Sequence, residues 1–308
     1  MSVTANTAFI TEFDTMVKHA YQGMGMLRDT VRNRTQIGAS QIRFPTLDAK
    51  AGVTRGTRQT SLIQNVVQTA PAPGTSATAA NQILAINSLL LDFTHGNQTA
   101  TMVDYVFPEM ADEFDLSKIN FDIKQEYAKA IGMSMGRTVD QVVINAANAA
   151  AVTQSVAAAS SGMTIAKLLE AKRRLDANGV MNMERCFVHD AESLEELLTT
   201  TQITSTDYNT VKTLVNGDVN TFLGFGFKMI NDRSTATGSG EGGLPLATNV
   251  VTNFAYAKDS IGLGFAMEPK TSVDYLPEYV SYLINGMISL GAVVIDPDGV
   301  VKVAADHS

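Results

Sequence analysis

The chain has 308 residues, 45% of them apolar, which is enough to bury one large core or two modest ones and excludes a disordered chain or a mini-protein. Its single cysteine, Cys186, cannot form an intramolecular disulfide, and no CxxC or Cys/His cluster is present to hold zinc. The net charge of −8 argues against a dedicated nucleic-acid-coating protein, because such domains are usually basic.

The N-terminal residues show no basic leader followed by an apolar run, and no uncharged apolar stretch of about 18 residues appears that could span a bilayer. We therefore expect a soluble, intracellular protein with no membrane partner.

The charges are distributed unevenly. The first 60 residues carry eight cations and four anions, a net charge of +4, whereas the rest of the chain carries −12. The cations that we single out are Arg28, Arg32, Arg34, Arg43, Lys50, Arg55 and Arg58. An acidic run with no cation before Lys118 includes Glu109, Asp112, Glu113 and Asp115. A basic segment followed by an acidic one predicts a subunit that contacts copies of itself through these residues. The alternative is a solvated surface on which charges cluster by chance.

Residues 40–47 and 82–93 are apolar or alternating, and they flank a turn-rich middle in which no charged residue occurs from Gln59 to Leu91. This pattern predicts two long strands joined by an extended β-loop. Ordinary connections have about 4 to 6 residues, so a projection of this length is costly unless another chain covers it. We expect it to lie on a neighbouring subunit.

The next element is a very long helix that begins after Asp115 or Asn120, either of which can cap it. Its apolar stripe continues for about seven turns. The stripe contains Ile119, Ile123, Tyr127, Ile131, Met135, Val139, Val142, Val143 and Ala146. Gly132 and Gly136 lie within this helix, among charged residues, and predict close packing against a sheet.

Beyond a linker near residue 155, Thr164 caps a second helix that ends at Gly179. A short buried strand over 186–189 leads to Asp190, which caps a third helix. This order predicts an α/β subdomain. Further strands are expected at 220–230, 250–254, 263–267, 272–275, 279–294 and 300–303, so the C-terminal third is mostly β.

The sequence offers little for chemistry. The four histidines belong to no HExxH or HxH pairing, and His189 next to Asp190 is better explained by a buried strand and a helix cap. Gly224 with Gly226, and Gly262 with Gly264, do not complete a dinucleotide fingerprint and predict bends in strands. No GxSxG or GxxxxGK[ST] motif exists, and the carboxylates at 109–115 have no calcium-loop spacing. We assign no catalytic, cofactor-binding or metal-binding residue.

The order of these elements resembles the major capsid protein of tailed bacteriophages, the Hong Kong 97-like fold. The local similarities are the helix ending in INAANAAA, the runs IAKLLEAKRRLDANGV and ERCFVHDAESLEELL, the segment TDYNTVKTLVNGDVNTFLGFGFKMI, and the terminal strands around ISLGAVVIDPDGVVKV. The resemblance spans nearly the whole chain.

The resemblance implies an α+β fold with five parts. They are an N-terminal arm at 1–35, an extended β-hairpin called the E-loop at 36–93, a P-domain with a long spine helix at 94–155, an A-domain at 156–262, and a return to the P-domain and C-terminus at 263–308.

The resemblance also implies a function. Many copies would assemble as hexamers and pentamers into an icosahedral phage head that encloses double-stranded DNA, after synthesis and assembly in the host bacterial cytoplasm. The expected partners are other copies of the chain, a portal, DNA bound weakly and non-specifically on the inner face, and a separate scaffolding protein, because few residues precede the arm. Two alternatives stay open: an encapsulin-type nanocompartment shell with the same fold, and an α/β enzyme of unknown activity.

Overall fold

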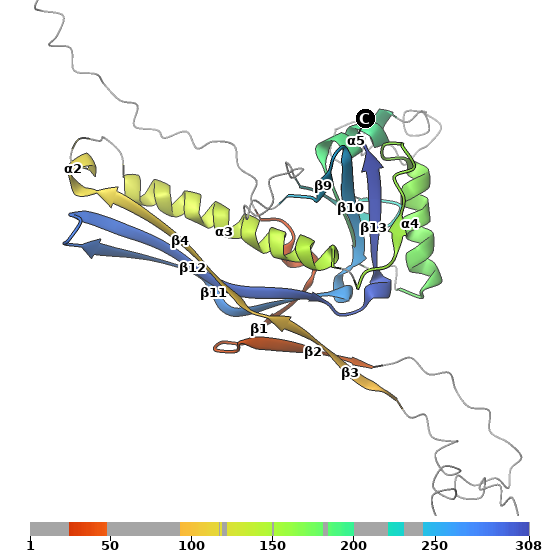
Figure 1. Cartoon of the computed structure of the whole chain (residues 1–308), viewed down its shortest axis with the longest axis horizontal. Helices are drawn as coiled ribbons and strands as arrows, with labels where there is room; N and C mark the ends of the chain where they lie inside the picture. The colour runs from red at the N-terminus through yellow and green to blue at the C-terminus, as the bar shows by residue number, and fades with distance from the viewer. Residues whose placement is uncertain are drawn as a thin grey trace, which may run out of the picture. The chain divides into compact units, whose positions relative to one another are not determined.

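The computed structural model describes residues 25–47, 93–116, 118, 122–149, 151–180, 184–199, 221–230 and 243–307. The chain divides into two compact units, one made of Met1–Arg43 with Thr99–Ser308 and the other of Phe44–Gln98. In the described residues, the first, larger unit has two sheets and the long helix (Figure 1). No helix in the described ranges is long and apolar enough to cross a membrane.

One sheet of the larger unit has four strands in the order β1-β11-β12-β4. The strands are β1 (Arg32–Thr35), β4 (Val103–Asp112), β11 (Ile261–Leu276) and β12 (Ser281–Val294). β1 runs parallel to β11, and the other neighbours are antiparallel. The sequence pattern divided β11 into two strands, whereas the structure has one 16-residue strand with irregular pairing between Phe265 and Lys270. Bulges of this kind interrupt the alternation of a strand without ending it.

The helix α3 (Ile123–Ala147) packs on this sheet, chiefly on β12, and follows the short helix α2 (Glu113–Leu116). Its N-cap is Asp122, whose carboxylate accepts a hydrogen bond from the amide of Lys124 at 3.1 Å, so the predicted caps Asp115 and Asn120 were wrong. The 25 residues of α3 span roughly 37 Å. The predicted apolar stripe is confirmed where Ile131, Met135 and Val139 are buried.

Glycines allow close contact around α3, but not as predicted. The sheet glycine Gly286 lies beneath the helix, where an added Cβ would come within 2.3 Å of Ile131 Cγ2. The helix glycine Gly136 instead meets the backbone of Gly25, and nothing lies within 4 Å of the Cβ position of Gly132. Gly136 thus allows the segment that leads into β1 to pack closely on α3. Gly286 allows α3 to pack closely on the sheet.

The second sheet has seven strands, with a path β5-β13-β10-β6-β8-β7 and β9 paired to β10. Its strands are β5 (Ser155–Val156), β6 (Arg185–His189), β7 (Thr221–Phe222), β8 (Phe225–Met229), β9 (Leu246–Ala247), β10 (Val250–Ala257) and β13 (Val300–Asp306). Two helices accompany it, α4 (Ile165–Ala177) and α5 (Ala191–Thr199). The Thr164 cap, the stop at Gly179 with φ +73°, and the buried strand at 186–189 agree with the sequence prediction.

The C-terminal strand β13 lies in the second sheet. The sequence division joined 263–308 in one return to the P-domain, but β13 pairs with β10 and β5 rather than with β11 or β12. The 3-10 helix η6 (Pro297–Gly299) separates β12 from β13, and this turn directs the two strands into different sheets. The family's domain names therefore remain a prediction for this segment.

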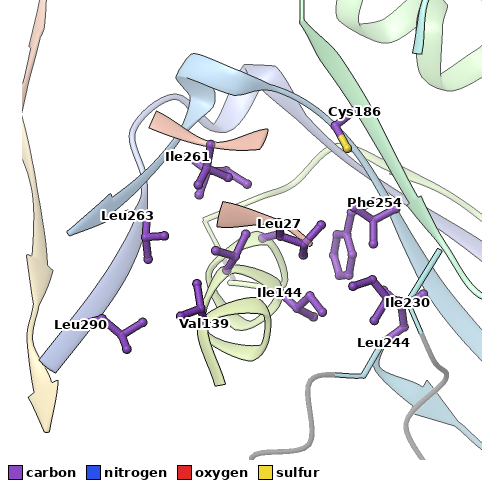
Figure 2. Close-up of a cluster of buried hydrophobic side chains, with 14 of the residues drawn as sticks. Leu27, Val139, Ile144, Cys186, Ile230, Leu244, Phe254, Ile261, Leu263 and Leu290 are labelled. Carbon is purple, nitrogen blue, oxygen red and sulfur yellow. The ribbon is translucent and has the colours of Figure 1, made fainter. Parts of the chain in front are cut away.

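Within the described ranges, two hydrophobic clusters form the core. One joins the inner face of α3 to β10, β11 and β12, and Figure 2 shows Leu27, Val139, Ile144, Phe254 and Leu263 among its members. The other lies between α4 and the seven-stranded sheet, around Leu168, Phe187 and Val303.

A third, two-stranded sheet pairs β2 (Gln41–Leu47) with β3 (His95–Thr101). β2 confirms the strand predicted at 40–47. The second predicted strand, 82–93, lies outside the described residues except for Phe93, which is not in a strand. The uncharged middle of the predicted E-loop also lies outside them.

Candidate assembly surfaces

The basic residues singled out from the sequence gather near β1, an edge strand of the four-stranded sheet. Arg32 and Arg34 lie on β1, all of whose residues are exposed, and Arg34 donates to the carbonyl oxygen of Arg43 at 2.9 Å. Arg28 pairs with Glu268 at 2.9 Å and lies over the ring of Phe265. We call Arg28, Arg32, Arg34 and Arg43 the basic end. Lys50, Arg55 and Arg58 lie outside the described residues.

The acidic residues lie at the other edge of the same sheet. Glu109 and Asp112 are exposed on β4, and Glu113 and Asp115 are exposed on α2 directly after it. Asp112 accepts a hydrogen bond from the amide of Phe114 at 2.7 Å, which starts the turn into α2. We call Glu109, Asp112, Glu113 and Asp115 the acidic end.

The two ends are far apart within one chain. Arg32 pairs in register with Gly262 of β11, whereas Asp112 lies opposite Ser281, which in turn lies opposite Leu276 of β11. Fourteen residues of strand separate these two positions along β11, a distance of roughly 45 Å. The basic and acidic ends therefore cannot pair with each other inside one subunit.

The face of the four-stranded sheet opposite α3 carries exposed apolar side chains. Ile284 and Ile288 of β12 are buried in the core cluster with α3, so the alternate residues Leu283 and Met287 point to the opposite face. Their cross-strand partners on β4 are Met110 and Val106, and Met267 of β11 lies opposite Ser289. Val106 is 62% exposed, Met267 45% and Met110 44%. We call these five apolar residues the outer face.

This outer face was missed by the sequence analysis. The signal was present in Val103–Asp112, where apolar residues occupy both alternating positions of the strand rather than one. A strand buried on both faces would give the same pattern, so only the edge position of β4 shows that one set is exposed.

Cys186, His189 and Asp190 each make a contact that stabilises the fold. Cys186 is buried in β6, and burial raises the pKa of its thiol to about 11, which leaves it protonated and unreactive at neutral pH. Burial lowers the pKa of His189, whose Nδ1 lies 2.8 Å from the carbonyl oxygen of Asp190. The carboxylate of Asp190 accepts from the amide of Ser193 at 3.3 Å and so caps α5, as predicted.

Known proteins resemble this chain in both sequence and fold. The family model described as phage capsid protein matches residues 5–307. No curated protein sequence matches the chain. The capsid of Helicobacter pylori bacteriophage KHP30, in its acid-stable form, superposes with a TM-score of 0.72 at 8% identity, covering 100% of this chain and 98% of that one.

Other phage structures give the same result. The capsid of cyanophage P-SCSP1u has a TM-score of 0.68 at 16% identity, covering 100% of this chain and 96% of that chain. A chain of Mycobacterium phage Che8 has a TM-score of 0.66 at 13% identity, with 97% of each chain covered. These likenesses show the Hong Kong 97-like major capsid fold that the sequence predicts. The chain belongs to the phage capsid protein family.

Proposed function

We propose that this chain assembles as hexamers and pentamers into an icosahedral phage head that encloses double-stranded DNA. The observation that carries the proposal is that the two ends lie apart on one sheet, with Arg32 and Asp112 roughly 45 Å from each other along the strands. Opposite charges that cannot meet within a chain can meet between chains, because the basic end of one copy can bind the acidic end of the next. Such a head-to-tail contact closes into a ring when the rotation between neighbours divides a full turn.

The outer face supports a second contact. Monomeric proteins rarely expose several large apolar side chains together, and such groups usually mark an interaction surface. Val106, Met110 and Met267 are each close to half exposed or more. We propose that the E-loop of a neighbouring copy covers this face. The loop is uncharged from Gln59 to Leu91, so it brings no charge that would have to be desolvated against an apolar surface.

The remaining proposed partners are DNA, a scaffolding protein and a portal. With a net charge of −8, the shell is expected to touch packaged DNA weakly and in a salt-sensitive way, through the few exposed arginines of the basic end. A scaffolding protein and a portal, acting during assembly in the host cytoplasm, complete the proposal.

Charge exchange tests the head-to-tail contact. Reversing the basic end with Arg32→Glu and Arg34→Glu, or the acidic end with Glu109→Arg and Glu113→Arg, should abolish closed particles, because like charges then meet between neighbours. Combining all four substitutions should restore assembly. The readout is the fraction of protein that sediments as particles at low salt, where surface charges are least screened.

Arg173→Glu is the matched control, since the Arg173 side chain is 71% exposed on α4, outside both ends. It should assemble like the unmodified protein. If the two double variants assemble normally, or if the fourfold variant remains as defective as each of them, the two ends are not partners.

A further inference from the structure

Topology brings the C-terminal residues beside the start of α5. β6 and β13 both pair antiparallel with β10, so they run in the same direction. Their C-terminal ends therefore lie on the same side of the seven-stranded sheet. β6 ends at His189 and is followed by Asp190, while β13 ends at Asp306 and is followed by His307. His307 and Asp190 are thus neighbours in space, although they are 117 positions apart in the sequence.

Both ring nitrogens of His307 face carboxylates. Nε2 lies 3.1 Å from Asp190 Oδ2, and Nδ1 lies 3.2 Å from Glu196 Oε1. The side chains of His307 and Asp190 are only 5% and 2% exposed. The carboxylate of Glu192 completes a group with Asp190 and His307 whose ligand atoms all lie within 4.8 Å of one another.

A cation would satisfy this arrangement. If Nδ1 donates its proton to Glu196, the lone pair of Nε2 points at the Asp190 carboxylate, and two acceptors face each other. The Ser193 hydroxyl lies 3.5 Å from Nε2, at the limit of a hydrogen bond, whereas the Asp190 oxygen is nearer, at 3.1 Å. Three carboxyl groups lie around the ring, so the cluster is rich in negative charge. Lys167 offsets only part of it, because its ammonium is held by the carbonyl oxygens of Ala158, Ser161 and Ala304.

The distances suit a metal ion. Ligands about 2.0 to 2.2 Å from a tetrahedral zinc ion lie roughly 3.3 to 3.5 Å apart, close to the observed separation between His307 Nε2 and Asp190 Oδ2. A histidine that binds zinc usually donates its other ring N–H to a carboxylate, which is the position of Glu196. Glu192 is exposed, so its carboxylate can move to close the site and leaves a path for entry.

We propose that His307 Nε2, Asp190 and Glu192 bind one divalent ion of the zinc class, with Glu196 orienting the imidazole and water in the remaining position. The mixed nitrogen and oxygen ligands favour zinc or a neighbouring transition metal over magnesium and calcium, which prefer oxygen alone. The ion ties the end of β13 to the start of α5 and so fastens the C-terminal end of the chain to the seven-stranded sheet.

Zinc binding by the untagged full chain tests this proposal. The protein is treated with a chelator, dialysed, and titrated with zinc chloride or magnesium chloride while the Tm and the heat of binding are followed. Zinc at a hundredfold excess over Kd should raise the Tm by about 3 to 6 °C, and magnesium should leave it unchanged.

Glu192→Gln should weaken zinc binding about tenfold or more, because the amide is a poorer ligand, while the exposed position keeps the fold intact. Glu195→Gln, the same change at an exposed site on the same helix, should bind like the unmodified protein. His307→Gln should bind no zinc at this site. The absence of any zinc effect on the unmodified chain, or equal zinc binding by Glu192→Gln and Glu195→Gln, would overturn the proposal and assign the buried ring a proton instead.

Discussion

Asp140 anchors the segment that leads into β1. Its carboxylate accepts hydrogen bonds from the amide of Met26 at 2.9 and 3.1 Å and from the amide of Leu27 at 2.9 Å. The residue is 2% exposed in the interior of α3. Burial raises the pKa of this carboxyl to about 6, although the backbone N–H groups lower it. Asp140 therefore anchors residues 26 and 27 at a cost that depends on pH.

The sign of that dependence can be measured. The pKa is higher in the folded chain than in the unfolded one, so the folded chain binds more protons between about pH 4 and 6, and this carboxyl lowers stability as the pH rises through that window. The loss amounts to about 3 kcal/mol. In urea unfolding at pH 4.5 and pH 7, Asp140→Asn should make the change in unfolding free energy between the two pH values more positive than in the unmodified chain.

Asp259→Asn is the control, because it makes the same change of residue type at an exposed position. An Asp140→Asn variant with the same pH dependence as the unmodified chain would contradict the assignment of a raised pKa to this carboxyl.

Among the elements, α3 contains two glycines whose surroundings differ. An added Cβ at Gly136 would lie 2.8 Å from the backbone nitrogen of Gly25, whereas Gly132 has nothing within 4 Å. Gly136→Ala should therefore destabilise the fold by about 1 to 3 kcal/mol, because two backbones must separate. Gly132→Ala should stabilise it by about 0.5 to 1 kcal/mol, because alanine favours a helix.

Thermal unfolding of the two alanine variants, measured side by side, checks this pair. Each variant serves as the control for the other, since both make the same change in one helix. Equal shifts in Tm would mean that Gly25 does not pack on Gly136 as described.

Local sequence patterns predict which side of α3 is buried but not which distant segments contact it. Residues such as Ile131, Met135 and Val139 repeat with the helical period, so local spacing alone predicts which side of α3 is buried. The contact between Gly136 and Gly25, and the pairing of β13 with β10, join segments that are distant in sequence. No local pattern encodes such partners. His307 stands alone in the sequence for the same reason, and only the shared side of the seven-stranded sheet brings Asp190 to it.

For the whole molecule, the family match identifies a phage capsid protein, and the distribution of surface groups suggests how copies meet. The basic and acidic ends lie at opposite edges of one sheet, and the outer face between them exposes apolar side chains. The sequence analysis anticipated the two charged segments because runs of like charge are visible in a sequence. It did not anticipate their separation, which follows from the strand order.

The central claim, that this chain builds a closed shell, is tested most directly by sedimentation velocity with negative-stain microscopy of the purified protein, alone and with lysate from its host. We expect closed particles, or rings of five and six copies, from the full chain, and neither from a variant lacking residues 64–80 that retains its helical circular dichroism signal. A full chain that stays a 32.9 kDa monomer under both conditions, or a deletion variant that forms normal shells, would contradict the account.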